Sequence, residues 1–571
     1  MRRNSLFLPA LCVLSLGGTV CASPRDELLR LVPDDAGFYI VVRDLREQFD
    51  RLVKSPFAAQ FAASPLGQVL AKAPELQRLA EFDRHLNANL NLTWAQLRDE
   101  ILGDAVVLAY TPGPPGRPEK EQGLFLAHAR RGDLLAGLFE RLNEVQKKAG
   151  EVTAVEARTY RGQTYQMRRK AKDAEEYYCI RGSLLILSDK EEALTRALDR
   201  AIANASSEPP ALARRLDALG VGRNLAVCWL NPKAFVPALR KKVASAAGGE
   251  AACLATFARY WEALDGVAWS LSVEREFAVT MTAAVRPSDL PPAARRMFGE
   301  SAKPSAVWTA FPKDALFIAA GRLPLQPLAD AGGEFLTSDG RKEVQEALAR
   351  SVGAFLGRDV LSAVLRNLGP DWGICLVPPI SGEKSWLPSL TAVLRLRAGG
   401  TVPVEQRVLD ALDLIARLSV VTYNTHRPDQ IRYRMVAQDG VDVRVLENDQ
   451  GFPPGLQPAF TWKDGYLVVA SSPDAVRRFR APTGDPPPSA EVPLIRIALS
   501  GWTNYLRNYR EPLATFLADA HGLPPGEVQK RLSHLLGTLE PFDVLEVTQR
   551  TGPGQAAVSV RLRTMAKLQP E

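Results

Sequence analysis

The stretch VPDDAGFYIVV at Val32–Val42 occurs a second time, in altered form, as FPKDALFIAAG at Phe311–Gly321. In both copies a proline is followed by an aspartate, an alanine and then an apolar run. A polar turn before such a run predicts a β-strand, and proline is tolerated where the strand has not begun to donate backbone hydrogen bonds. The two copies therefore predict equivalent strands in the two halves of the chain.

Four further pairs of similar segments follow these strands, in the same order in both halves. The pairs are Leu97–Pro112 with Leu365–Pro379, Ile180–Ala201 with Trp462–Ala481, Leu225–Val243 with Leu494–Leu513, and Asp265–Val285 with Asp543–Arg563. The offset of roughly 270 residues is far longer than the ~20–50 residues of a solenoid repeat. We therefore infer a gene duplication that gave two tandem homologous domains, residues 23–287 and 306–565, joined by a linker rich in proline and charge at 288–305.

The order of elements expected in each half is β-α-β-β-α-β-β-α-β-α-β-β. Strands that arrive in adjacent pairs, rather than in strict alternation with helices, favour an α+β fold with a mostly antiparallel sheet. We expect each domain to form such a sheet with its helices packed on one face.

Residues 1–22 have the features of a secretory signal peptide. Arg2 and Arg3 form a basic start, an apolar stretch follows, and Val20–Ala22 suits cleavage near Ala22. Lipidation of Cys21 is one alternative, although the residue before a lipidated cysteine is normally small and Val20 is not. An uncleaved N-terminal anchor is another. Since no later stretch reaches the ~18 apolar residues of a transmembrane helix, we expect an exported protein, periplasmic or extracellular.

Charge and composition narrow the possible partners. The chain is 46% hydrophobic, enough for two sizeable cores, and its net charge of +7 falls to +5 once the two arginines of the signal peptide are removed. This mild charge and the predicted export argue against nucleic acid as a partner, while an acidic polymer or lipid surface stays possible.

The mature chain keeps four cysteines, Cys179, Cys228, Cys253 and Cys375. They form no CxxC motif, and a disulfide-dependent scaffold would need more cysteines at closer spacing. We interpret them as small apolar residues of strands and helices, with a single disulfide as the alternative.

No catalytic signature is present in the sequence. It contains no GxSxG elbow, no phosphate-binding loop and no HExxH motif. The five histidines, none of which has a counterpart in the other half, are His85, His128, His426, His521 and His534. We assign no catalytic, cofactor-binding or metal-binding residue, and expect these histidines to be structural or exposed.

One basic cluster stands out in the first half, interleaved with Tyr160 and Tyr165. Its members are Arg158, Arg161, Arg168, Arg169, Lys170 and Lys172. Arginines in this density can bind carboxylate or phosphate. The competing interpretation, which we favour, is the polar face of an exposed hairpin, because the matching stretch at residues 431–449 is not comparably basic.

The Pro-x-Asp-Ala strand opening after a signal peptide, the Leu-Gly before a strand and the Gly-strand-Ser-helix unit together resemble the exported bacterial proteins of the domain-of-unknown-function 3352 family. The resemblance covers most of both halves, rests on structural motifs and implies an extracytoplasmic protein without an assigned activity.

These observations favour a non-catalytic binding or scaffold protein of the cell envelope or periplasm, of unknown ligand, that uses the groove between its two halves. A hydrolase with a site assembled from dispersed residues is the alternative. A third possibility is association with an acidic surface through the hairpin at residues 158–172.

Overall fold

The computed structural model describes residues 23–171, 174–203, 208–301, 303–356, 363–364, 366–379, 385–397, 404–484 and 489–568. The predicted signal peptide at 1–22, Cys21 and Lys172 lie outside these ranges. The described residues form one large antiparallel sheet with many helices, which confirms the α+β class.

The strands of the two halves follow the same spatial order. In the first half this order is β4 (Val152–Tyr160), β5 (Gln163–Lys170), β6 (Glu175–Arg181), β7 (Leu184–Ser188), β3 (Gln122–His128), β2 (Ala105–Thr111), β1 (Phe38–Arg43), β8 (Ala226–Leu230), β9 (Leu264–Val273) and β10 (Phe277–Val285). In the second half it is β14 (Arg432–Gln438), β15 (Val441–Glu447), β16 (Ala459–Lys463), β17 (Tyr466–Ala470), β13 (Ser389–Leu396), β12 (Leu368–Val377), β11 (Phe317–Arg322), β18 (Val492–Ala498), β19 (Phe542–Gly552) and β20 (Gln555–Thr564).

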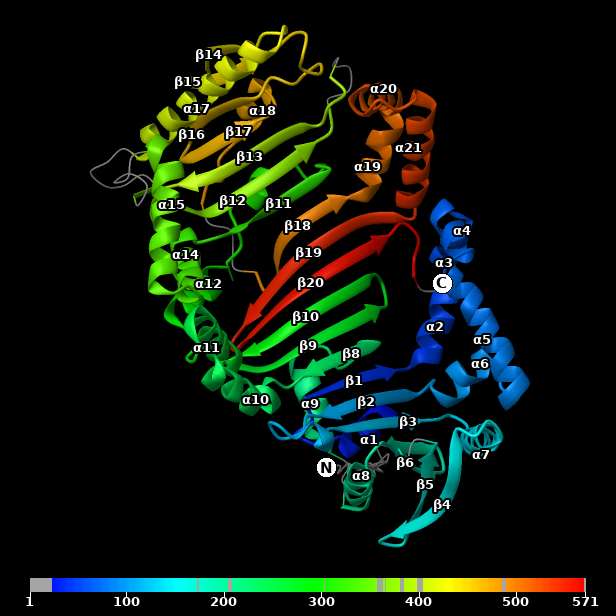
Figure 1. The fold of residues 1–571 in the computed structure, drawn as a ribbon. Coiled ribbons are helices and arrows are strands. Elements are labelled where there is room, and N and C mark those ends of the chain that lie inside the picture. The colour runs from blue at the N-terminus through cyan, green and yellow to red at the C-terminus, as the bar shows by residue number, and fades with distance from the viewer. Residues whose placement is uncertain are drawn as a thin grey trace, which may run out of the picture.

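The two halves are joined strand to strand. β10 pairs antiparallel with β20 from Phe277, opposite Leu562, to Ala284, opposite Gln555, and Figure 1 shows the two strands side by side. The sheet of the described residues therefore has twenty strands. The two copies of the opening stretch take equivalent places: β1 lies between β2 and β8, and β11 lies between β12 and β18. The halves therefore share one continuous sheet rather than flanking a groove at this junction.

The strand pattern predicted for each half is wrong by two strands. The predicted strand at 156–168 is the hairpin β4–β5, and the predicted strand at 177–188 is the hairpin β6–β7. In the first hairpin Arg161 and Gly162 both have positive φ, as do Asp439 and Gly440 in the matching β14–β15 hairpin. Two consecutive residues with positive φ are typical of the tight type I′ turn. Because this turn has only two residues, the sequence shows no polar segment long enough to mark the boundary between the two strands.

The helices of the first half are α1 (Pro24–Leu31), α2 (Leu45–Val53), α3 (Pro56–Ala63), α4 (Pro65–Ala71), α5 (Pro74–Leu90), α6 (Trp94–Gln96), the π-helix η1 (Leu97–Ile101), the 3₁₀-helix η2 (Pro118–Lys120), α7 (Gly132–Lys148), α8 (Glu191–Ala203), α9 (Ala211–Ala218), α10 (Pro232–Ser245) and α11 (Gly248–Glu262). Those of the second half are α12 (Pro292–Ser301), α13 (Val307–Ala310), α14 (Leu325–Glu334), α15 (Ser338–Leu356), α17 (Val404–His426), α18 (Pro473–Arg478), α19 (Leu499–Asn508), α20 (Arg510–His521) and α21 (Pro525–Leu539). Among the described helices, none is both long and apolar enough to cross a membrane.

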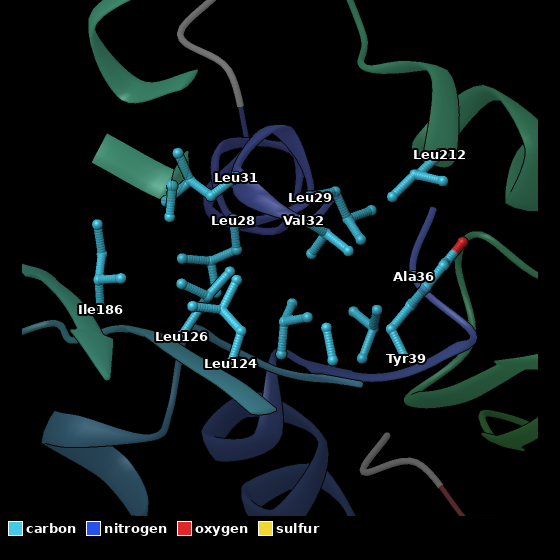
Figure 2. Packing of buried hydrophobic residues seen from close by; sticks show 14 of the residues in the cluster. Leu28, Leu29, Leu31, Val32, Ala36, Tyr39, Leu124, Leu126, Ile186 and Leu212 are labelled. Atoms are coloured by element: carbon cyan, nitrogen blue, oxygen red, sulfur yellow. The ribbon is translucent and has the colours of Figure 1, made fainter. Parts of the chain in front are cut away.

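Helices pack on both faces of the sheet, so the prediction of one covered face is wrong. On one side, called here the α8 face, Leu28 of α1 points toward Leu124 and Leu126 of β3, and Leu29 and Leu31 join the same cluster with residues of α8 and α9 (Figure 2). On the other side, the α7 face, Leu135 and Phe139 of α7 pack on Ala127 of the same strand. Buried residues on both faces give β3 the unbroken apolar run Leu124–Ala127, which is typical of a strand covered on both sides.

The second half repeats this arrangement at the other end of the sheet. α13 and α18 pack on the α8 face, where Val307 and Val476 join a cluster with Val468. α17 lies on the α7 face, where its Val404 packs with Leu396 of β13. Each face is therefore covered near the two outer ends of the sheet.

Two groups of helices stand at the two ends of the central strands (Figure 1). At one end, the ring of Phe57 on α3 lies 6.1 Å from that of Phe542 on β19. At the other, Thr256 of α11 donates a 2.8 Å hydrogen bond to the Glu334 carbonyl of α14. At the first end α4 also packs against α21, so each group combines helices from both halves. The predicted linker at 288–305 contains α12, which packs against α14.

Candidate binding face

Across the twelve strands that run from β2 to β17 in the sheet, eight large apolar side chains are exposed, and all eight lie on the α7 face. The outer strand β14 exposes two more, Met435 and Val436, which point to opposite faces. The strand pairing shows on which face each side chain lies. Residues directly opposite each other on paired strands point to the same face, and successive residues of one strand point to opposite faces. These eight residues, called here the apolar floor, are Leu108, Trp269, Val279, Met281, Ile374, Leu390, Val469 and Val560, with exposed fractions between 37% and 52%.

Direct cross-strand pairing connects most of the apolar floor into two rows that run across the strands. The first row is Leu108–Ile40–Cys228–Trp269–Met281–Val558. The second row is Val279–Val560–Val547–Ile495–Ala319–Ile374–Ala392–Val469. None of these residues carries a charge. At a strand spacing of ~4.8 Å, the twelve strands from β2 to β17 give this surface a length of about 50 Å.

The α8 face of the same central strands is polar. Thr280 of β10 and Ser559 of β20 form a 2.9 Å hydrogen bond across the junction of the halves. Beside them, Arg563 lies 3.3 Å from Glu546 and 3.8 Å from Glu276. The usual pattern puts apolar residues against the protein and polar residues toward water. The central α7 face is apolar and yet exposed, which is typical of a binding surface.

The extent of the apolar floor also separates it from ordinary surface. Single exposed apolar residues are normal, but contiguous patches above ~300–600 Å² mark interaction or ligand sites in monomeric proteins. Eight large side chains that are each roughly half exposed, together with the partly exposed neighbours in their rows, exceed this size.

Helices bound the apolar floor at both ends of the central strands. At one end Phe57 of α3 packs edge-on against Phe277, which lies on the α7 face of β10, with 5.5 Å between ring centroids. At the other end Lys233 of α10 lies 2.7 Å from Asp265, on the α7 face of β9. Helices therefore contact the α7 face at both ends of the central strands, and the floor together with these helices is called here the trough.

A basic cavity opens at the second of these ends. It has a volume of about 650 Å³, and its charged lining is Lys233, Arg240, Arg259, Arg286, Glu262 and Asp289. Carboxylates hold these cations in place: Arg240 pairs with Glu262 at 2.8 Å, and Arg286 pairs with Asp265 at 3.3 Å. Arg259 lies 3.8 Å from Glu334 and Arg286 lies 2.6 Å from Asp289, so each of the four cations has a carboxylate partner.

The sequence-predicted basic cluster is neutralised by carboxylates. Each described member pairs with one: Arg158 with Glu191, Arg161 with Asp199, Arg168 with Glu176, Arg169 with Glu175 and Lys170 with Glu176. Arg168 is buried, so its charge faces the protein interior. The hairpin thus has few free cations to offer an anion.

The histidines and cysteines do not converge on a site within the described ranges. His128 lies 3.4 Å from Asp104 and 3.5 Å from Glu27, and the described residues contain no metal-binding group of histidine, cysteine and carboxylate. The four cysteines are unpaired, so the described chain has no disulfide. Burial raises the pKa of the Cys375 thiol to about 12, as expected of a structural cysteine.

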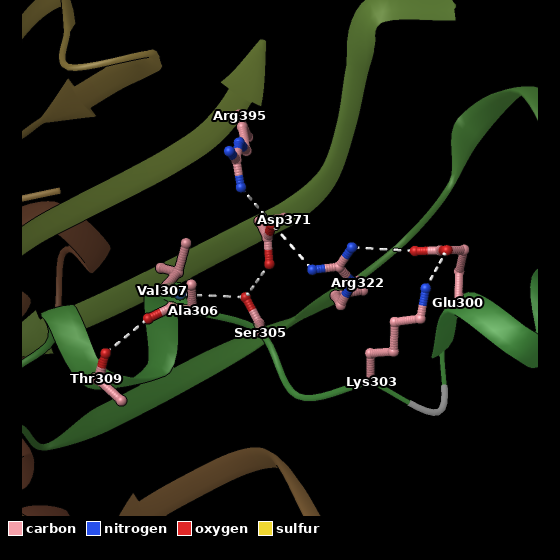
Figure 3. A network of polar contacts seen from close by, with 9 residues as sticks. All are labelled: Glu300, Lys303, Ser305, Ala306, Val307, Thr309, Arg322, Asp371 and Arg395. Atoms are coloured by element: carbon pink, nitrogen blue, oxygen red, sulfur yellow. Dashed lines mark hydrogen bonds and ion pairs between the residues drawn. The ribbon is translucent and has the colours of Figure 1, made fainter. Parts of the chain in front are cut away.

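One fully buried carboxylate, Asp371 of β12, lies on the α8 face of the second half. It accepts a 2.9 Å hydrogen bond from Ser305 and lies 3.4 Å from both Arg322 and Arg395 (Figure 3). Arg322 also reaches Glu300 of α12 at 3.0 Å. Since its partners occupy both carboxylate oxygens, Asp371 fixes the 300–305 segment to the sheet rather than facing a ligand.

Sequence reasoning placed the binding surface in a groove between the halves and so missed the apolar floor. A signal was present in β10, where Val279 and Met281 alternate with Thr280 and Thr282. Such alternation predicts two unlike faces. It does not tell which of them the helices leave open.

Comparison of the chain with models of protein families, with curated proteins and with solved structures found no match.

Proposed function

We propose that this is an exported, non-catalytic binding protein whose ligand is apolar and lies on the apolar floor. The observation that carries the proposal is that, on the twelve strands from β2 to β17 in the sheet, all eight exposed large apolar residues lie on one face. Burial of such side chains is worth ~25 cal/mol per Å² removed from water, and this driving force favours any apolar molecule that can enter the trough. The features of residues 1–22 support export.

We further propose that the binding protein arose by internal duplication, with domains at 23–287 and 306–565. The identical strand order of the two halves and the equivalent places of β1 and β11 support this. Both halves contribute to the apolar floor, and at the junction Val279 of β10 lies opposite Val560 of β20 and Met281 lies opposite Val558. A duplicated unit thereby yields a surface about twice as long as one half provides.

The proposal is tested with the chain from Ser23 onward and the apolar dye ANS, whose fluorescence rises on binding. The floor variant combines Val279→Glu with Val560→Lys, which replaces two central floor residues by opposite charges while the strands keep their pairing. We expect it to weaken ANS binding on the order of tenfold.

The matched control is Ile202→Glu on α8, an equally exposed apolar residue outside the trough. Its ANS binding should equal that of the wild type. Equal loss in both variants, or no loss in the floor variant when circular dichroism shows both to be folded, would contradict the apolar floor as the binding surface.

A further inference from the structure

We propose that two copies of this chain associate through β14, so that one continuous sheet runs across both copies. This interface is separate from the apolar floor and does not depend on the proposed function. Three features of the second half support it: an open sheet edge, a register in which that edge is complementary to itself, and an apolar stripe on the helix beside the edge.

The first feature is the exposure of β14, which lies at one outer end of the sheet (Figure 1). Among the described strands it pairs with β15 alone, and five of its seven residues are exposed. The exposed residues include Met435 and Val436. An unpaired strand edge of this kind is a template for the addition of another strand.

The backbone of this edge directs hydrogen-bonding groups outward. Leu446 of β15 donates its N–H to the Pro458 carbonyl, away from β14, and lies opposite Tyr433. In an antiparallel pair, such non-bonded positions alternate along the strand with bonded ones. The N–H and C=O groups of Tyr433, Met435 and Ala437 therefore point away from the sheet, and no hydrogen bond from the described part of the chain reaches them.

The matching edge of the first half is interrupted. β4 corresponds to β14, and Ala157 stands at the position of Met435, four residues before the two-residue turn. The pairing of β4 with β5 shifts register between Val152 and Ala154, whereas β14 pairs with β15 without a shift over its whole length. Bulges are a common protection against edge-to-edge pairing. This protection is present in β4 and absent from β14.

Charge also gives β14 little protection. Arg432 pairs with Asp449, and Arg434 lies 3.3 Å from Glu447 of β15, so both arginines are held within the chain. The rest of the strand, residues 435–438, carries no charge. An approaching strand therefore meets an uncharged edge over more than half of its length.

The symmetry of the outward groups selects a second copy of this chain as the partner. When two β14 strands pair antiparallel about Met435, Met435 of one copy lies opposite Met435 of the other, and Tyr433 lies opposite Ala437. Every outward N–H then finds an outward carbonyl. The contact uses the same surface on both copies, so the association closes as a dimer.

The side chains agree with this register. On the other face of the strand, Arg434 of one copy lies opposite Val436 of the other, and Arg432 lies opposite Gln438. No two charged side chains are directly opposite each other, which would destabilise the pair. A pairing centred on Arg434 would instead place two arginines face to face.

α17 carries the apolar stripe, which consists of Leu414, Leu418 and Val421. These residues are spaced by four and three positions, so they lie on one side of the helix, and they are 46%, 50% and 64% exposed. Exposed apolar residues in such a row are typical of a helix that packs against a partner.

The stripe lies on the side of α17 that faces the open edge. Arg417 is three residues after Leu414 and four before Val421, and its guanidinium lies 4.8 Å from the ring centroid of Tyr433 on β14. Val408, on another side of the helix, instead packs in a cluster with Trp462 of β16. When two β14 strands pair, α17 of each copy therefore comes to lie beside the stripe of the other.

The size of this interface predicts a dimer of moderate affinity. Seven strand residues span ~23 Å, and a strand with a helix packed on it is ~20 Å deep. The interface thus buries about 1,000 Å² in total, at the lower end of specific interfaces, so we expect a micromolar dissociation constant. Since residues opposite each other share a face, the apolar floors of both copies open on the same side.

The test is sedimentation velocity of the chain from Ser23 onward, which should change from monomer to dimer between about 1 and 100 μM. Met435→Pro removes an outward N–H that makes no bond within the chain, so β14 keeps its pairing with β15. We expect it to weaken the dimer at least tenfold. Ala157→Pro, at the equivalent position of β4, is the matched control and should dimerise as the wild type does.

A second variant tests the stripe without a change in the strand. Leu414→Glu places a charge at the interface in each copy and should also weaken the dimer at least tenfold. Ile202→Glu on α8 changes an equally exposed residue far from this edge and should have no effect. Circular dichroism checks that each variant is folded.

A cross-link tests the register. Directly opposite residues of a bonded antiparallel pair have Cα atoms ~5.5 Å apart, within the range that a disulfide spans. In a Cys253→Ser background, Met435→Cys should therefore form a covalent dimer on mild oxidation, and Ala157→Cys should not.

Four results would overturn the assignment. A wild-type chain that stays monomeric at 100 μM does not self-associate. Loss of association in Ala157→Pro as well as in Met435→Pro would mean that β14 pairs with β4 of the next copy, as an open chain. A dimer that persists in both Met435→Pro and Leu414→Glu uses another surface. A dimer lost in the floor variant Val279→Glu/Val560→Lys forms through the apolar floor instead.

Discussion

Val279 of β10 lies directly opposite Val560 of β20, and the two half-exposed side chains stand side by side on the α7 face. This pair is at once the contact that joins the two halves of the chain and the centre of the apolar floor. The junction and the candidate site therefore depend on the same register.

The first prediction tests that register by charge. Val279→Glu with Val560→Lys should keep the free energy of unfolding within ~1 kcal/mol of the wild type, since opposite charges directly across an antiparallel pair attract. Val279→Glu with Val560→Glu should be less stable than that variant by ~0.2–1 kcal/mol, measured by urea unfolding. Equal stabilities would contradict the pairing of β10 with β20.

The second prediction compares two leucines on neighbouring strands and opposite faces. Leu126 of β3 is fully buried under α1, whereas Leu108 of β2 belongs to the floor. Leu126→Ala should cost ~2–5 kcal/mol of unfolding free energy because it leaves a cavity. Leu108→Ala should cost less than ~1 kcal/mol but weaken ANS binding. A similar destabilisation by both would mean that the floor is packed rather than open.

The third prediction concerns Asp371. Asp371→Ala removes the buried carboxylate that Arg322 and Arg395 share, and leaves the nearly buried Arg322 with Glu300 as its one remaining carboxylate partner. The expected cost is ~3–5 kcal/mol in denaturant unfolding, typical of one partner removed from a buried ion pair. As a control, Glu527→Ala breaks an exposed pair with Arg531 on α21 and should cost ~0.5 kcal/mol or less. Equal effects of the two substitutions would refute a buried network.

The fourth prediction is a pH dependence. A hydrogen bond from Lys303, and then one from Arg322, hold the pKa of Glu300 below its ordinary value of 4.5. Because the folded pKa is lowered, this stabilisation is complete above about pH 4.5 and is lost as the pH falls through the folded pKa. The stability difference between wild type and Glu300→Gln should shrink over that acidic range. A difference that stays constant down to pH 3 would argue against the lowered pKa.

The fifth prediction concerns thiol reactivity. Cys253 on α11 is exposed, whereas Cys179 and Cys375 are buried and their thiol pKa values are raised by burial. At pH 8 a disulfide reagent such as DTNB should label Cys253 first and Cys228 more slowly, and the two buried thiols only after unfolding. Cys253→Ser should remove the fast phase. If a fast phase remained, another thiol would have to be exposed.

Much of the fold, but little of the candidate site, could be predicted from the sequence. The paired motifs located strands that occupy equivalent places, as β1 and β11 show. Two hairpins were missed because turns such as Arg161–Gly162 are too short to interrupt the pattern. The basic hairpin was a candidate anion site in the sequence because the carboxylates that neutralise it are not recognisable there as its partners. Asp199, which pairs with Arg161, belongs to a different element of the chain.

Local patterns determined which residues form strands and that the central strands have two unlike faces, because alternation is a property of neighbouring residues. Only the tertiary structure decided that β10 pairs with β20, that helices cover both faces at the outer ends, and that the apolar side of the centre stays open. These features depend on contacts between segments that are hundreds of residues apart in the sequence. The free energy of packing over the whole sheet selects which strand pairs with which, and a local sequence pattern contains no information about that choice.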